Sequence, residues 1–193
     1  MKSIAVFCGA GEGNKPVYAE AARLLGAALA GMNIQLVYGG ARIGLMGAVA
    51  DAALLAGGSV VGVIPQFLKT KEVAHTGLTE LITVDNMHER KLRMHELSDG
   101  IITLPGGWGT MEEVFEMLTW GQLGLHTKPI GILNVNGYYN ALSTQCDIMV
   151  AEGFLNAETR KMLLHSDNIE DLLNKMHTFI PVSVPKWISE TGT

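Results

Sequence analysis

Short apolar runs alternate with longer helical patterns along most of this chain. The runs are continuously apolar, as in strands that are buried on both faces of a parallel sheet. We expect strands at 4–8, 34–38, 59–64, 81–84, 101–104 and 130–133. We expect helices at 16–30, 45–56, 87–97, 110–123, 138–151, 157–163 and 169–176. Strands that alternate with helices predict a single α/β domain, a parallel sheet with helices on both faces.

We place this domain at residues 1–180 and an irregular tail at 181–193. The polar segment 66–77 interrupts the alternation and is typical of a loop or flap. In open parallel sheets, ligands bind outside the carboxyl ends of the strands. The segments that follow Cys8, Tyr38, Ile64 and Leu104 therefore share one rim, and each contains glycine or proline.

Composition narrows the class of ligand. Hydrophobic residues make up 48% of the 193 residues and charged residues 17%, which suits a packed core. The net charge is −5, and the densest basic run is Arg90, Lys91 and Arg93 on one helix. This distribution favours one small anionic ligand over a nucleic acid. No apolar stretch is long enough to cross a membrane and no targeting segment is visible, so we expect a soluble cytoplasmic protein.

Cysteine usage predicts no metal site. Cys8 and Cys146 lie far apart in the sequence and have no metal-ligand spacing, so we expect two reduced thiols and no metal. We also expect no cofactor. The first glycine-rich turn, 8–13, resembles a dinucleotide fingerprint, but the position that needs the last glycine is Asn14. An NAD-dependent enzyme is therefore disfavoured.

Two further glycine-rich turns each connect a strand to a helix. In the second, residues 39–47, we expect Gly39 and Gly40 to let backbone N–H groups approach an anion at a helix start. A tight, purely structural turn is the alternative. The third turn, residues 104–109, has three glycines in four positions before Thr110, which we predict to be the helix N-cap. These turns predict a site for a nucleotide-type phosphate.

Glu113 has two interpretations at this stage. The Thr110-x-x-Glu113 spacing is that of a capping box, in which the glutamate folds back to the N–H of the cap residue. Alternatively, the carboxylate faces the site. The local sequence leaves both open.

Two segments together resemble the LOG (Lonely Guy) family, whose members were often mislabelled as lysine decarboxylases. Residues 105–113, Pro-Gly-Gly-Trp-Gly-Thr-Met-Glu-Glu, resemble its Pro-Gly-Gly-x-Gly-Thr-x-x-Glu motif. Residues 87–91, Met-His-Glu-Arg-Lys, resemble the Met-His-x-Arg-Lys segment that precedes it. The resemblance continues through 38–40, 44–47 and 62–65, and so covers most of the chain to about residue 154. Ala41 and the Ala-Gly pair at 10–11 depart from the family pattern.

The resemblance implies a Rossmann-like fold and a homodimer with active sites near the subunit interface. It implies hydrolysis of cytokinin riboside 5′-monophosphates, and often AMP, to the free base and ribose 5-phosphate. Carried over by motif, Arg90 and Glu113 are the catalytic pair. The residues that the resemblance places against the nucleotide are Glu72, Lys91, Gly107, Trp108, Gly109, Thr110, Met111, Glu112 and Thr119.

These residue types suit cleavage of an N-glycosidic bond. Positive charge builds on the ribose as the base leaves, and a carboxylate such as Glu113 can stabilise or attack it. Arg90 stays protonated, so it can hold a phosphate, a hydroxyl or the carboxylate but cannot act as a base. Arg93, one helical turn on, competes for that role. Two rival functions are a non-catalytic nucleotide-binding protein and a pyridoxal-phosphate decarboxylase, for which no lysine stands in a suggestive context.

Overall fold

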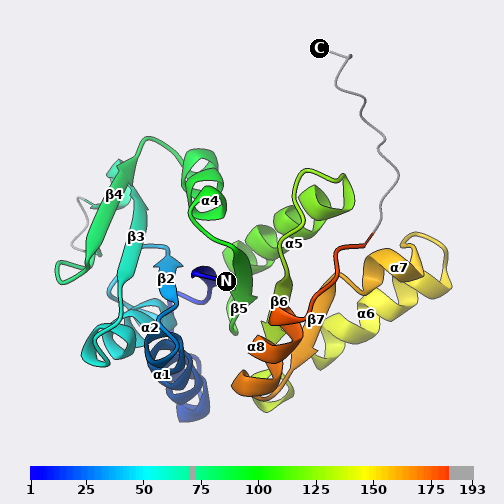
Figure 1. The fold of residues 1–193 in the computed structure, drawn as a ribbon, viewed down its shortest axis with the longest axis horizontal. Helices are drawn as coiled ribbons and strands as arrows, with labels where there is room; N and C mark the ends of the chain where they lie inside the picture. Colours follow the sequence, from blue (N-terminus) through cyan, green and yellow to red (C-terminus); the bar gives the residue numbers. More distant parts are fainter. Residues whose placement is uncertain (70–72, 183–193) are drawn as a thin grey trace.

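The computed structural model describes residues 1–69 and 73–182. They form one domain around a seven-stranded sheet in the order β4-β3-β2-β1-β5-β6-β7, and every strand pair is parallel (Figure 1). The strands are β1 (Ser3–Phe7), β2 (Gln35–Tyr38), β3 (Val60–Pro65), β4 (Glu80–Val84), β5 (Gly100–Thr103), β6 (Ile130–Leu133) and β7 (Leu163–Ser166). The predicted α/β class and parallel sheet are confirmed.

Helices cover both faces of the sheet, as predicted. They are α1 (Pro16–Gly31), α2 (Gly44–Leu55), α3 (Gln66–Lys69), α4 (Met87–Glu96), α5 (Trp108–Gln122), α6 (Asn140–Ala151), α7 (Ala157–Arg160) and α8 (Ile169–His177), with a 3₁₀ turn at Val135–Gly137. One core cluster joins α1, α2 and α8 to one face, and a second joins α4, α5 and α6 to the other. Each fully buried aliphatic side chain in these clusters contributes about 1.5–3 kcal/mol.

Strand order reverses between β1 and β5, because the chain adds β2 to β4 on one side of β1 and β5 to β7 on the other. The first and third glycine turns leave the carboxyl ends of these two neighbouring strands. Their backbones are joined, since the Gly9 N–H donates to the Pro105 carbonyl over 3.0 Å. The fold therefore brings both turns to the place where open α/β sheets bind ligands.

Three predicted elements differ from the structure in type or in bounds. The helix expected at 157–163 ends at Arg160, and β7 begins at Leu163 as an edge strand beside Ile130 of β6. The expected loop at 66–77 begins with the short helix α3. The helix predicted from Thr110 begins two residues earlier, at Trp108. Within the predicted tail, residues 183–193 lie outside the described residues.

Membrane insertion by a helix finds no support in the described part of the chain. None of its helices is both long enough and apolar enough to span a bilayer.

Candidate active site

The start of α5 differs from the sequence prediction in a way that frees Glu113. The N-cap residue is Gly107, with an extended backbone, and Thr110 lies inside the first turn. Thr110 is buried because its side chain packs on Gly106, where an added Cβ would lie 2.1 Å from the Thr110 Oγ1. Thr110 is therefore not the N-cap. Because Glu113 is the sixth residue of the helix rather than the third, the capping-box interpretation is wrong.

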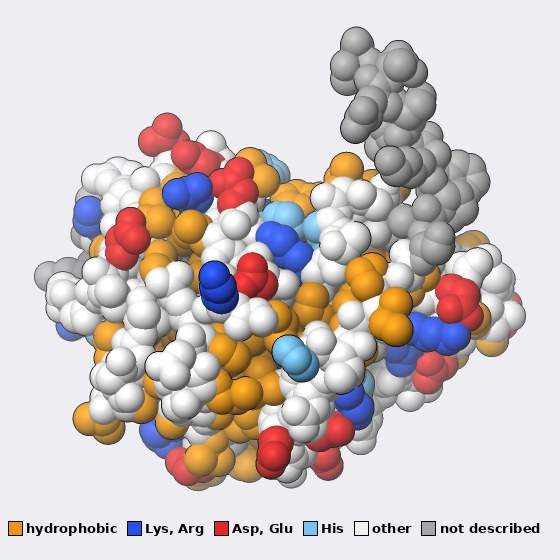
Figure 2. Space-filling model, in the orientation of Figure 1, with side chains coloured by type: hydrophobic (Ala, Val, Ile, Leu, Met, Phe, Trp, Pro, Cys, Tyr) orange, Lys and Arg blue, Asp and Glu red, His pale blue; other side chains and the backbone are white. Residues whose placement is uncertain are grey.

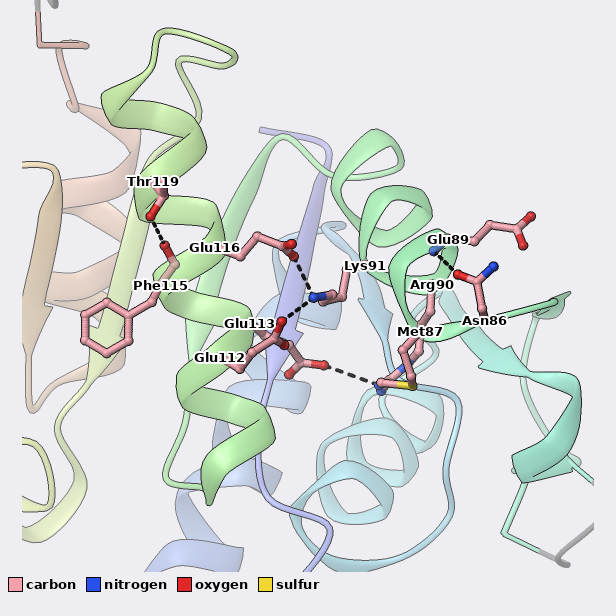
Figure 3. A network of polar contacts seen from close by, with 10 residues as sticks. All are labelled: Asn86, Met87, Glu89, Arg90, Lys91, Glu112, Glu113, Phe115, Glu116 and Thr119. Carbon is pink, nitrogen blue, oxygen red and sulfur yellow. Dashed lines mark hydrogen bonds and ion pairs between the residues drawn. The ribbon is translucent and has the colours of Figure 1, made fainter.

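The carboxyl group of Glu113 instead faces Arg90. Glu113 Oε1 lies 3.3 Å from Arg90 Nη1, and both residues are buried, at 6% and 8% exposure (Figure 3). The pair joins the N-terminal halves of α4 and α5 across the rim of the sheet. The structure thus brings together the two residues that the family resemblance named as catalytic.

Arg90 is positioned by contacts with α4, β3 and the second glycine turn. The Asn86 side chain caps α4 by accepting from the Glu89 N–H, 2.9 Å away, which fixes the start of the helix. Arg90 Nε donates to the Val63 carbonyl at the end of β3, over 3.2 Å. An added Cβ on Gly39 would lie 2.0 Å from Arg90 Nη2, so only glycine leaves room for the guanidinium. Arg93 instead pairs with Glu96, 3.0 Å away, on the exposed side of α4.

Burial controls the ionisation of Glu113. Burial raises the pKa of Glu113 to about 7, although the nearby Arg90 charge acts in the opposite direction. The group can therefore gain or lose a proton near neutral pH. Burial, with the Glu113 charge adding to it, also raises the pKa of the Cys8 thiol beneath the site. A neutral, buried thiol of this kind is a poor nucleophile.

Lys91, next to Arg90, forms a second charged cluster with α5. Its side chain is only 3% exposed, and its ammonium group contacts Glu112 and, at 3.0 Å, Glu116 (Figure 3). Burial lowers the pKa of Lys91, but its hydrogen bonds to these two carboxylates outweigh burial and raise it. Sequence reasoning missed Glu116. The i, i+4 spacing of Glu112 and Glu116 was the available signal, since it places both carboxylates on one helix face.

The first and third glycine turns line a pocket of about 390 Å³ beside the start of α5. An added Cβ would meet nothing within 4 Å at either Gly107 or Gly109, so their backbones face open space. The first turn of α5 has no side-chain cap, which leaves helix N–H groups for a ligand. This arrangement is typical of a phosphate site.

The second glycine turn has a different role. Gly39 and Gly40 are both buried, and neither is among the described residues that line the pocket. Gly40 has a φ of +75° and packs against Ile64 and Leu81. The N–H of Leu45, at the start of α2, donates to the Gly9 carbonyl over 3.1 Å. This turn supports the site through packing, and direct contact of Gly39 and Gly40 with a substrate stays a prediction.

The remaining predicted contacts are dispersed. Trp108 is 92% exposed, while Met111 is half-buried. Thr119 lies on the side of α5 that points away from Arg90, and its hydroxyl donates to the Phe115 carbonyl over 2.7 Å (Figure 3). Within one chain, the structure does not bring Thr119 to the pair. Glu72 lies outside the described residues.

A large groove lies away from this chemistry. It has a volume of about 820 Å³ and runs between α1 and α8, where hydrophobic side chains gather low in the middle of the view (Figure 2). Neither Arg90 nor Glu113 lines it. Across residues 1–69 and 73–182, no group of three or more His, Cys, Asp or Glu residues is placed to hold a metal ion.

Comparisons with known proteins match most of this chain. A family model described as "Possible lysine decarboxylase" matches residues 46–176. The chain is 45% identical over 181 residues to the cytokinin riboside 5′-monophosphate phosphoribohydrolase LOG1 of Arabidopsis thaliana, covering 94% of this chain and 85% of that protein. It is 51% identical over 170 residues to the enzyme of the same name from Rhodococcoides fascians, covering 88% and 86%.

Solved structures support the fold. The molybdenum cofactor binding protein from Rippkaea orientalis superposes with a TM-score of 0.70 and 22% identity, over 91% of this chain and 95% of that one. The structure titled TM1055 also gives a TM-score of 0.70 and 22% identity, over 93% of this chain and all of that one. Likeness at this level of identity concerns the fold alone.

Proposed function

The chain belongs to the LOG family, matched by the "Possible lysine decarboxylase" model, and from this premise we propose that it hydrolyses adenine-type nucleoside 5′-monophosphates. The products are the free base and ribose 5-phosphate. The observation that carries the proposal is the buried Glu113 carboxyl, held 3.3 Å from Arg90 on the helix whose N-terminus opens on the glycine pocket.

The reaction breaks the bond between the anomeric carbon and the base nitrogen. Water supplies its hydroxyl to the anomeric carbon and a proton to the departing base. The ionised Glu113 stabilises the positive charge that builds on the ribose ring. Its burial strengthens this interaction, because the field of a carboxylate is less screened away from bulk water. Arg90 keeps the carboxylate in place through Nη1 while its Nε stays on the Val63 carbonyl.

The phosphate of the substrate occupies the glycine pocket. The first turn of α5 presents N–H groups and the positive end of the helix dipole, which together favour an anion. Gly107, which lines the pocket, lets the phosphate approach the backbone closely, since no side chain intervenes, and Gly109 keeps the first turn of α5 equally open. We keep Glu72, Lys91, Trp108, Met111 and Thr119 as proposed nucleotide contacts.

A homodimer would explain how Thr119 contacts a nucleotide, because the residue could then face the site of a second copy. Exposed apolar side chains lie on α5 and directly after it, at Phe115, Leu123 and Leu125. Such side chains are typical of a subunit interface, and Thr119 lies on the same helix. We therefore propose that a second copy covers this side of α5. Light scattering coupled to size-exclusion chromatography measures the mass of the assembly directly.

We also propose that the protein works in the cytoplasm. Both Cys8 and Cys146 are buried free thiols, which is usual for proteins of a reducing compartment. Imaging of a fluorescently tagged chain in its host cell tests this location.

Decarboxylation with pyridoxal phosphate is disfavoured by the ion pairs of Lys91, the lysine beside Arg90. A lysine that forms a Schiff base needs a neutral amine, which enzymes obtain by lowering its pKa. The pKa of Lys91 is raised instead, because two carboxylates hold its ammonium group.

The deciding experiment is product analysis. The purified protein is incubated with AMP and with a prenylated adenine nucleotide, and base and ribose 5-phosphate are separated by chromatography. The proposal expects stoichiometric release of both products. The same nucleosides without phosphate are the matched control, and we expect them to react far more slowly. Binding of the nucleotides without any release of base would instead establish a non-catalytic nucleotide-binding protein.

A further inference from the structure

Two tyrosines connect the first and third glycine turns, and nothing in the catalytic account uses them. We propose that Tyr18 and Tyr138 are positioning residues that hold these two turns at the separation needed to grip a phosphate. The inference rests on the proposed function in one respect, because it takes the phosphate of the nucleotide as the ligand.

Tyr138 acts on the third turn. Its hydroxyl donates to the Gly106 carbonyl over 2.6 Å. A trans peptide is planar, so the Gly106 carbonyl and the Gly107 N–H point in opposite directions from one rigid unit. Holding the carbonyl therefore fixes the direction of the Gly107 N–H at the start of α5. The Tyr138 hydroxyl thus orients the Gly107 N–H through the carbonyl of the same peptide unit.

Tyr18 acts on the first turn. Gly13 has a φ of +74°, and an added Cβ there would lie 2.8 Å from Tyr18 Cδ2, so the turn is folded closely over the ring. The ring of Tyr18 in turn packs edge-on against that of Tyr138, with centroids 5.8 Å apart and an interplanar angle of 78°. Edge-to-face pairs of this kind are favourable in themselves. A continuous series of contacts therefore runs from Gly13 to Gly106.

The tyrosine pair is anchored to the sheet. Tyr138 packs at 89° against the buried Tyr139, with centroids 4.9 Å apart. The Tyr139 hydroxyl donates to the Leu104 carbonyl, just beyond β5, over 2.7 Å. Tyr18 and Tyr138 both line the glycine pocket, while Arg90 and Glu113 do not. The pair is therefore placed to control phosphate affinity and not the bond-breaking step.

Tyr138→Phe is the sharpest test, because it keeps the ring and removes the hydroxyl. Calorimetry with ribose 5-phosphate as the probe should show a dissociation constant about three- to tenfold larger, the usual effect of one lost neutral hydrogen bond. The KM for AMP should rise by a similar factor, with kcat changed by less than about twofold, as expected when uniform binding is lost. Tyr18→Leu, which removes the ring contact, should weaken ribose 5-phosphate binding as well.

Thr144→Val is the matched control. It removes a hydrogen bond of 3.0 Å that the Thr144 hydroxyl donates to the Asn140 carbonyl within α6, outside the pocket. The affinity for ribose 5-phosphate and the KM for AMP should both stay unchanged. Thermal unfolding of each variant checks that the fold persists. An unchanged ribose 5-phosphate affinity in a folded Tyr138→Phe protein would overturn the inference. Weakened binding of adenosine with unchanged binding of ribose 5-phosphate would also overturn it, because the tyrosines would then contact the base.

The two proposals fail separately. If the wild-type protein releases no base from any nucleotide, hydrolysis is wrong, but the ribose 5-phosphate affinities still compare Tyr138→Phe with wild type. If wild type hydrolyses AMP and Tyr138→Phe binds ribose 5-phosphate equally well, the reaction stands and the positioning role is wrong.

Discussion

The glycine turns before α2 and before α5 look alike in sequence, since both follow a buried strand and open a helix. Their glycines face different surroundings. Before α2, Gly39 makes room for the Arg90 guanidinium, and Gly44, with a φ of +59°, lies against the Ala10 backbone. Before α5, Gly107 and Gly109 face open space. One turn is packed on protein and the other is open to a ligand.

The difference shows what a glycine-rich turn can mean. A glycine is required either because another part of the protein occupies the place of its side chain, or because a ligand does. The count and spacing of glycines do not separate these cases. The surroundings of each missing Cβ do. They show that Gly39, before α2, makes room for Arg90, and they support our proposal that the turn before α5 contacts the phosphate.

Glu113→Gln, on the helix that follows the open turn, should have the largest effect on turnover. The amide keeps the shape of the side chain but carries no charge, so we expect kcat for AMP to fall by about 10²–10⁴-fold, the range typical of a lost catalytic side chain. Steady-state assays with circular dichroism measure the loss and check the fold. Near wild-type turnover in the folded variant would show that Glu113 is structural and that the proposed mechanism is wrong.

Gly39→Ala should reveal the role of the packed turn. The added methyl group would meet Arg90 Nη2 at 2.0 Å, and a displaced guanidinium can no longer hold Glu113 in place. Because the obstruction is the end of a flexible side chain, we expect a loss of only about 1–3 kcal/mol in unfolding free energy. Turnover should fall by about 10²-fold, as for a misplaced catalytic group. Denaturant titration and kinetics separate the two effects, and unchanged turnover would remove the link between Gly39 and catalysis.

Gly109→Ala should have the smallest effect, which we expect on the KM for AMP and not on the stability of the fold. Its methyl group has free space in the protein, and alanine in a helix is more stable than glycine by about 0.5–1 kcal/mol. We therefore expect a fold at least as stable as wild type. The KM for AMP should rise about tenfold, because the methyl group enters the space of the phosphate. An unchanged KM would mean that the phosphate binds elsewhere.

Much of the scaffold was predictable because its signals are local. Continuous apolar strands and regular helices predicted the parallel sheet. Because the carboxyl ends of parallel strands share one edge of the sheet, the glycine turns that follow them were expected to lie together. The edge strand β7 was missed, since the apolar residues Met162, Leu163 and Leu164 fit the end of a helix equally well. Their pairing with β6 is a tertiary contact that local periodicity does not contain.

At the site, the errors came from side-chain packing at the start of α5 and from contacts between helices. Thr110 has a good N-cap side chain, but its packing on Gly106 places the helix start two residues earlier. The ion pairs of Lys91 with Glu112 and Glu116 join two helices and follow from the fold. The choice of Arg90 over Arg93 likewise depends on which side of α4 faces β3.

The most direct test of the central claim is the pH dependence of kcat/KM for AMP. Because the pKa of Glu113 is raised to about 7, the group is mostly protonated below that pH, and activity that needs the carboxylate should rise as the pH passes through about 7. Since Arg90 acts to lower this pKa, the rise should move to higher pH in the residual activity of Arg90→Ala and stay in place in Arg93→Ala. A profile that is flat between about pH 5 and pH 8, or one that Arg90→Ala leaves in place, would contradict the account.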